Sequence, residues 1–163
     1  MRKTLIVLVI FALIATYSFA GTATASFDEM KALEGKWIGK NSKGEPVSVS
    51  YELVANGTAL VETLHGMNEI MTTVYHTDGS NLMMTHYCGA GNQPRMRADL
   101  SGGNAKVIPF AFFDGTNIPS QDTPHMHKLQ VTFIDQNHFS QQWTFMDHGK
   151  EMSDLFTFER AKN

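Results

Sequence analysis

The sequence contains a single cysteine, Cys88, among its 163 residues. One cysteine excludes an internal disulfide, so an apolar core has to hold the fold together. The chain also lacks the G-x-S-x-G and H-E-x-x-H motifs and any glycine-rich loop that would cradle a phosphate. Internal repeats, low-complexity segments and interdomain linkers are absent after residue 26. These absences exclude disulfide-stapled scaffolds and repeat architectures, and they leave no motif that fixes a reaction.

The N-terminus has the pattern of a secretory signal peptide. Arg2 and Lys3 precede an uncharged apolar stretch over residues 5–15, and small residues follow as far as Ala25. The strongly apolar part is shorter than the ~20 residues that a membrane-spanning helix needs. We therefore predict that residues 1–25 are removed after Ala25, with Ala20 as the alternative site. The protein would be periplasmic or extracellular, without a membrane span after cleavage.

The remaining segment, residues 26–163, is predicted to be one domain. Removing Arg2 and Lys3 with the signal peptide changes the formal net charge from −3 to −5. A mildly acidic surface argues against nucleic acid and anionic membrane as partners. It leaves a small molecule as the expected partner.

Hydrophobic alternation and regularly spaced turn residues predict an all-β domain. A short helix is predicted over residues 27–33, with Ser26 as its N-cap, and a loop over 114–124. About ten short strands imply an up-and-down antiparallel sheet, and closure into a barrel removes its edge strands. The predicted strands are 36–41, 46–55, 58–65, 69–77, 81–88, 94–100, 105–113, 125–134, 138–146 and 151–160.

A short helix followed by Gly35-Lys36-Trp37 resembles the opening of the calycin superfamily of barrels, including lipocalins. The resemblance implies that Trp37 closes the barrel floor and that Arg160, on the final strand, packs across it. Ten strands look closer to the fatty-acid-binding and nitrobindin-like branches. The segments Thr85-His86-Tyr87-Cys88 and Gly91-Asn92-Gln93-Pro94-Arg95-Met96 are also similar to a group of uncharacterised bacterial secreted proteins.

Alternation along the strands predicts a polar cluster within an aromatic lining. His86 and Cys88 share one face of their strand with Leu82 and Met84, because side chains two residues apart point the same way. Polar groups among aromatic side chains are typical of ligand pockets. We therefore predict a site for a small, partly apolar molecule, with Phe133 and Phe145 in its apolar wall. The predicted contacts are His86, Arg95, His125, His127, Gln141 and Trp143.

The placement of Arg95 depends on which face of its strand points inward. Arg95 and Arg97 alternate with Met96, so either the arginines or the apolar residues line the interior. A buried arginine needs a carboxylate partner, and Glu62 is the candidate within the chain.

Four other functions remain open, and one of them is a purely structural or interaction module. His86, Cys88, His125 and His127 offer nitrogen and sulfur ligands that suit copper or zinc. The nitrobindin-like resemblance implies haem, with His125 or His127 as the proximal ligand. Cys88 beside a histidine would also allow an enzyme that uses a thiolate nucleophile.

Overall fold

The computed structural model describes residues 19–66, 69–104, 106–120 and 122–162. Most of the predicted signal peptide, residues 1–18, lies outside the described residues. The described part of the chain begins with helix α1 (Phe19–Lys31). No helix in the described part is long and apolar enough to cross a membrane.

Ten strands follow the helix in the described part of the chain. Each pairs antiparallel with its neighbours in the sequence, and β10 returns to pair with β1, so the sheet is a closed barrel. This confirms the predicted fold class. The strands are β1 (Gly35–Lys40), β2 (Pro46–Val54), β3 (Ala59–Gly66), β4 (Glu69–Asp78), β5 (Asn81–Tyr87), β6 (Gln93–Ala98), β7 (Val107–Thr116), β8 (His125–Asp135), β9 (His138–Asp147) and β10 (Lys150–Arg160).

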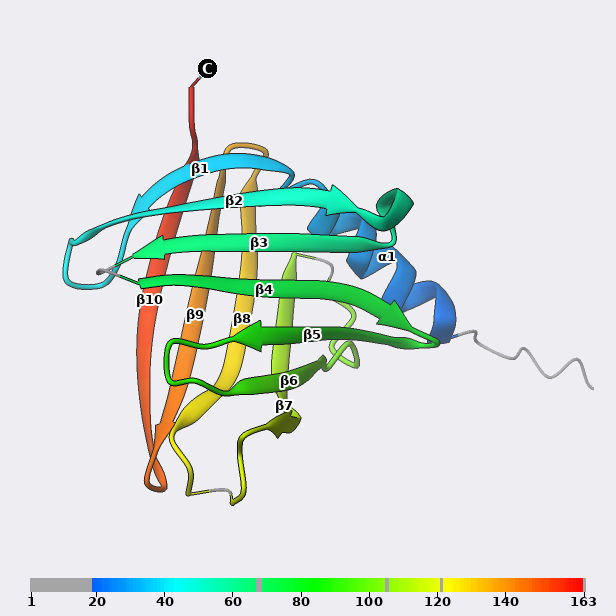
Figure 1. Cartoon of the computed structure of the whole chain (residues 1–163). Coiled ribbons are helices and arrows are strands. Elements are labelled where there is room, and N and C mark those ends of the chain that lie inside the picture. The colour runs from blue at the N-terminus through cyan, green and yellow to red at the C-terminus, as the bar shows by residue number, and fades with distance from the viewer. Residues whose placement is uncertain (1–18, 67–68, 105, 121, 163) are drawn as a thin grey trace, which may run out of the picture.

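The barrel is strongly coiled. In Figure 1, β1 to β5 run across the view and β8 to β10 run nearly perpendicular to them. Helix α1 lies at the end of the barrel where β2 and β4 finish, and it contacts β4 and β5. The loops after β1, β3, β5, β7 and β9 gather at the opposite end, because successive antiparallel strands alternate in direction. We call this the loop end.

Helix α1 begins earlier than the predicted residue 27 and continues through Ser26, which is buried inside it and is not its N-cap. Buried residues recur at helical spacing, at positions 23, 26, 27 and 30. This stripe packs on the barrel and extends the helix toward the N-terminus. The physical reason for the error is that tertiary packing, rather than a capping residue, sets where the helix starts.

Trp37 and Arg160 close the helix end of the barrel. They are register partners on β1 and β10, and the guanidinium carbon of Arg160 lies 4.1 Å from the centre of the Trp37 ring. Trp37 Nε1 donates to the Leu33 carbonyl over 2.7 Å. Arg160 donates to the carbonyls of Ala32 and Glu34, each over 2.9 Å. These three carbonyls belong to the turn between α1 and β1, so the residues that close the barrel also hold this turn in place.

The seam between β1 and β10 needs a glycine at position 39. A Cβ atom there would lie 2.1 Å from the Thr157 carbonyl oxygen and 2.8 Å from the Phe158 ring. Close approach of the two strands therefore excludes any side chain at this position. The pairing covers only Trp37 to Lys40, and beyond it the Ser42 amide and hydroxyl donate to Asp154 at 3.1 and 2.5 Å.

Strand β7 continues past its predicted end at residue 113. After a register shift between Arg95 and Met96, residues Asp114 to Thr116 still pair with β6. Gly115 suits this close pairing, because a Cβ atom there would lie 3.0 Å from both the Gln93 carbonyl oxygen and the Pro94 Cα on β6. The loop that follows is therefore shorter than predicted.

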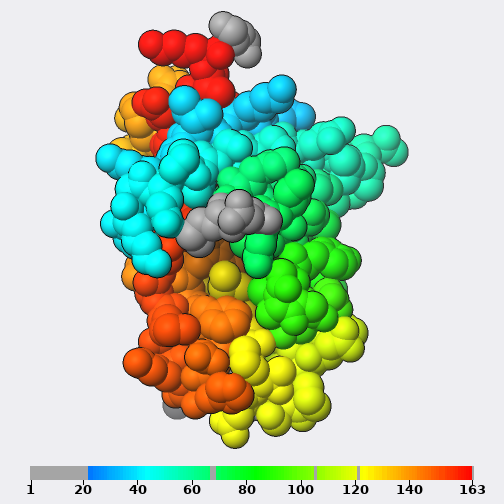
Figure 2. All heavy atoms as spheres, turned by 60° about the vertical axis from the view of Figure 1, so that its left-hand side comes forward, coloured from blue at the N-terminus to red at the C-terminus, as the bar shows by residue number. Residues whose placement is uncertain are grey.

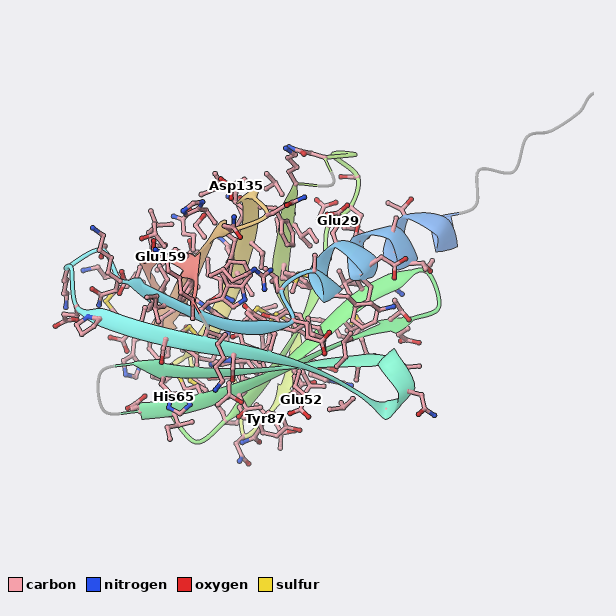
Figure 3. All side chains as sticks on the ribbon, turned by 90° about the horizontal axis from the view of Figure 1, so that it is seen from above. Glu29, Glu52, His65, Tyr87, Asp135 and Glu159 are labelled. Carbon is pink, nitrogen blue, oxygen red and sulfur yellow. The ribbon has the colours of Figure 1, made fainter. Side chains whose placement is uncertain are left out.

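The outer surface of the barrel is polar where alternation predicts it. Figure 3 shows the molecule from above, with six of the outer side chains labelled. All six are exposed: Glu29, Glu52, His65, Tyr87, Asp135 and Glu159.

Candidate functional site

A row of polar side chains crosses the inner face of four adjacent strands. Tyr51 on β2 stands opposite Glu62 on β3, Glu62 opposite Thr73 on β4, and Thr73 opposite His86 on β5. All four are buried, with exposed fractions of 3% or less. Because inward positions on neighbouring strands are in register, alternation within each strand is enough to align them. Gln141 reaches the same row from β9.

Glu62 is the centre of this network. Its Oε2 atom accepts hydrogen bonds from Tyr51 (2.7 Å), Tyr75 (2.9 Å) and Gln141 Nε2 (2.7 Å). Its Oε1 atom accepts from Thr73 Oγ1 at 3.3 Å. Burial raises the pKa of the Glu62 carboxyl, and the hydrogen bonds it accepts oppose that rise. The carboxylate is thus surrounded by neutral donors rather than by a cation.

The two tyrosines stay protonated inside the barrel. Burial raises the pKa of both Tyr51 and Tyr75 well above 10, and the charge of Glu62 raises it further. Both hydroxyls therefore serve as donors to the carboxylate across the neutral pH range. Gln141 Nε2 also donates to the Tyr51 hydroxyl over 2.9 Å.

His86 ends the row on the side of the loop end. Its Nδ1 atom lies 3.0 Å from Thr73 Oγ1. Within the described part of the chain, its buried Nε2 atom has no hydrogen-bond partner. Burial lowers the pKa of His86 to about 4, so the ring is neutral at pH 7. A buried nitrogen that lacks a partner is rare in proteins and marks a candidate contact for a ligand.

Trp143 packs beside His86, with 4.7 Å between the ring centres. Its Nε1 donates to Gln141 Oε1 over 3.1 Å, so the indole hydrogen is already used. Trp143 is 2% exposed and offers a neighbouring group only its apolar surface. His86 and Trp143 together therefore place one unbonded nitrogen against an aromatic wall.

His125 and His127 form a second cluster at the loop end. His125 Nδ1 donates to the Thr123 carbonyl over 2.6 Å, so in the neutral ring Nε2 is an acceptor. His127 Nδ1 lies 3.2 Å from that atom and acts as the donor. Phe112 packs against both rings, at 4.5 and 5.8 Å between centres.

His127 is partly exposed and faces Glu151. Its Nε2 atom lies 4.0 Å from the carboxylate, which Lys128 also bonds. Burial lowers the pKa of His127, as do the neighbouring His125 and Lys128, while Glu151 acts in the opposite direction. The two histidine rings of this cluster are thus hydrogen-bonded to each other at the loop end, and neither bonds a member of the Glu62 network.

Arg95 lies outside the barrel. Met96 is fully buried, which settles the alternative left open by the sequence: the apolar side of β6 faces inward. Arg95 is exposed and bonds Asp114 on β7 through two nitrogens. The structure thus separates Arg95 from His86, Gln141 and Trp143, and it gives Glu62 tyrosine partners instead of an arginine.

The four candidate metal ligands are not gathered into one site. Among the described residues, no group of three or more histidine, cysteine, aspartate or glutamate side chains is placed to hold a metal ion. His86 bonds Thr73, whereas His125 and His127 bond each other.

Cys88 is half-buried at the start of the loop after β5. Burial raises the pKa of its thiol, and the charge of Glu69 adds to the rise, while hydrogen bonds to the backbone of Ala90 and Met126 oppose it. A thiol in this environment is less ionised than a free cysteine, which does not favour a nucleophilic role.

Sequence reasoning misses several members of the network. The predicted site does not include Tyr51, Thr73 or Tyr75, and it names Glu62 as a candidate partner for an arginine rather than as the centre of the network. Alternation marks each of them as inward, since Tyr51 follows Val49 by two residues and Glu62 lies between Leu60 and Leu64. Asn92 was also missed, and its contacts depend on the conformation of two loops.

Two cavities outlined by described residues lie away from this network. One, of about 770 Å³, is a groove over β1, β2 and the end of β10, lined among others by Ile38, Lys40 and His65. The other, of about 360 Å³, lies between α1 and the loop after β6. The face that contains the loop end is hollowed between the orange and green segments in Figure 2.

No protein-family model matches the chain. A comparison with curated proteins also finds no match. Among solved structures, the chain is similar to a protein of unknown function from the DUF3598 family of Nostoc punctiforme, with 14% identity and a TM-score of 0.53. The match covers 81% of this chain but only 49% of that protein, so the chain spans about half its length. At this identity the likeness shows the fold alone.

Two further structures are less similar. A redesigned β-barrel has 13% identity and a TM-score of 0.39, over 81% of this chain and 94% of that one. The structure of EF1p2_mFAP2b bound to DFHBI has 10% identity and a TM-score of 0.41, over 83% of this chain and 99% of that one.

Proposed function

We propose that this chain is an exported β-barrel that binds a small, partly apolar molecule. The observation that carries the proposal is His86, whose buried Nε2 atom lacks a partner beside the apolar surface of Trp143. Burying a polar atom without a hydrogen bond costs roughly 1–3 kcal/mol, and a ligand that supplies the bond removes that cost. The closed barrel with its aromatic interior supports the same function.

The ligand would enter at the loop end. Helix α1, Trp37 and Arg160 close the other end, so access there would require opening several hydrogen bonds. At the loop end, His86 is the second-to-last residue of β5, just before the hairpin loop. Export rests on the signal-peptide pattern of residues 1–25, which predicts a periplasmic or extracellular location.

Native mass spectrometry tests the proposal. Protein purified from its own compartment, without organic solvent, should carry a reproducible extra mass that is lost on denaturation. Trp143→Leu should reduce the retained fraction, whereas Tyr87→Leu, which changes an exposed aromatic residue next to His86 on β5, should not. A bare chain mass, together with no uptake of apolar probes by the purified protein, would contradict the proposal.

A further inference from the structure

The second buried atom without a partner lies on the same hairpin as His86. Asn92 is 3% exposed, and within the described residues its Oδ1 atom has no hydrogen-bond partner. Its Nδ2 atom donates to the Pro124 carbonyl over 2.8 Å, which assigns the unbonded atom as the amide oxygen. Asn92 Oδ1 is therefore an acceptor that lacks a donor.

Asn92 and His86 share the inner face of the β5–β6 hairpin. The Cys88 amide donates to the Asn92 carbonyl over 3.1 Å, so Asn92 stands across from Cys88. His86 precedes Cys88 by two residues and points to the same side of the strand. Diagonal neighbours of this kind have Cα atoms about 7–8 Å apart, within reach of one small molecule.

Hydrogen-bond directions show that His86 Nε2 is also an acceptor. With Glu62 as a carboxylate, Oε1 can only accept, so the Thr73 hydroxyl donates its hydrogen to it. Thr73 Oγ1 can then only accept from His86 Nδ1, which places the single ring hydrogen on Nδ1. The low pKa of His86, about 4, agrees with one ring hydrogen at pH 7. The Nε2 atom consequently presents a lone pair.

The interior also lacks a positive charge to attract an anion. No lysine or arginine is among the buried residues of the described chain. Glu62, the one buried carboxyl group among the described residues, faces neutral donors and supplies no positive charge. An anionic ligand would meet two acceptors without a compensating cation.

From these observations we propose, on the basis of the proposed function, that the ligand is a hydrogen-bond donor. Its N–H or O–H groups meet His86 Nε2 and Asn92 Oδ1, and its apolar body lies against Trp143. The class comprises alcohols, phenols, amines and amides with an apolar part. Carboxylate anions, including those of fatty acids, are excluded.

Three matched probes test this ligand class by equilibrium dialysis at pH 7. They are 2-naphthol, a neutral donor; 2-methoxynaphthalene, which lacks the donor; and 2-naphthoate, an anion. The wild-type protein should bind 2-naphthol at least about tenfold more tightly than either of the others, the factor that one net hydrogen bond supplies. In His86→Phe, 2-naphthol should weaken to the level of the ether, while the ether itself binds as before.

His76→Phe provides the matched control, because His76 lies on the outer side of β4 and should keep the wild-type preference. A second measurement uses the wild-type protein alone and does not depend on the folding of a variant. In ¹⁵N NMR of the histidine rings, the His86 Nε2 signal should start at the position of an unprotonated nitrogen. It should shift with 2-naphthol and stay in place with 2-methoxynaphthalene.

Different results would overturn different parts of the argument. Equal affinity for 2-naphthol and 2-methoxynaphthalene, or tighter binding of 2-naphthoate, would overturn the donor class and leave a small-molecule-binding barrel. An Nε2 signal at the position of a protonated nitrogen would overturn it as well. Failure of all three probes to bind, with a bare mass in native spectra, would overturn the proposed function and this inference together.

Discussion

The amide nitrogen of Gln141 lies 2.7 Å from the carboxylate oxygen Oε2 of Glu62, so a side chain from β9 meets one from β3 inside the barrel. These strands are not neighbours in the sheet. The bond therefore ties opposite walls together and fixes Gln141 Oε1 as the acceptor for Trp143 Nε1. The position of the aromatic wall depends on this one amide.

Gln141→Leu should destabilise the fold. The substitution removes a donor to Glu62 and Tyr51 and leaves Trp143 Nε1 without its acceptor. Loss of partners for buried polar atoms should lower the free energy of unfolding by roughly 2–3 kcal/mol. Urea denaturation measures the change. Gln142→Leu, on the exposed side of the same strand, is the control. Equal stability of the two variants would show that the bridge contributes nothing.

His86 should make the protein sensitive to acid. Burial lowers the pKa of His86 to about 4, below the ~6.5 of an unfolded chain. A base whose pKa falls on folding stabilises the native state above its unfolded pKa, and this contribution is lost as the pH falls. The loss occurs between about pH 6.5 and 4 and amounts to about 3 kcal/mol.

The difference between the wild type and His86→Phe isolates this effect. Glu62, whose pKa is raised, acts with the opposite sign: its contribution is lost as the pH rises through its folded pKa. Because Glu62 is present in both proteins, it cancels to first order in the comparison. Chemical denaturation from pH 7 to pH 4 should show a steeper decline for the wild type. Parallel curves would mean that His86 titrates normally in the fold.

Arg160→Lys should weaken the closure at the helix end. Lysine keeps the charge but loses the planar group that lies over Trp37 and the two bonds to the carbonyls of Ala32 and Glu34. We expect a loss of about 1–2 kcal/mol in the free energy of unfolding.

Arg97→Lys is the matched control for this substitution, because Arg97 lies over the exposed Phe113 ring at 5.0 Å on the outer surface. Thermal unfolding followed by circular dichroism should give a lower Tm for Arg160→Lys than for Arg97→Lys. Similar values would assign the closure to the Trp37 packing alone.

Packing of helix α1 favours cleavage of the signal peptide after Ala20 rather than Ala25. Ala23 is fully buried and Ser26 is 6% exposed, so cleavage after Ala25 would remove Ala23 from the buried face of the helix, whereas cleavage after Ala20 would keep it. We expect the intact mass of exported protein to begin at Gly21. A mass that begins at Ser26 would show that the barrel folds without the first part of the helix.

Cys88 should alkylate slowly. Burial and the charge of Glu69 raise the pKa of its thiol, which lowers the thiolate fraction at pH 7. Iodoacetamide should therefore react more slowly with the folded protein than with the urea-unfolded chain. The unfolded chain is the control, because its Cys88 is exposed to solvent. A faster reaction in the folded protein would revive the enzyme interpretation.

The sequence by itself determined the strand content and the facing of most side chains. A period of two follows from the geometry of a strand, so His86, Gln141 and Trp143 could be assigned inward without knowledge of their neighbours. The regular spacing of turn residues between the strands also predicts the hairpins, and hairpins make neighbouring strands antiparallel. Trp37 and Arg160 could be named as a pair from a resemblance in local motif, and in the structure they are in contact.

Tertiary structure alone decided which of those inward residues meet. Alternation cannot decide whether Arg95 or Met96 points into the barrel, because either face of β6 could line the interior. The packing of the neighbouring strands buries Met96. The bond between Glu62 and Gln141 joins residues 79 positions apart, and its existence depends on barrel diameter and strand tilt. Such contacts arise from closure of the sheet, which no local pattern encodes. For that reason, the network around Glu62 and the unbonded nitrogen of His86 emerge only in the folded barrel.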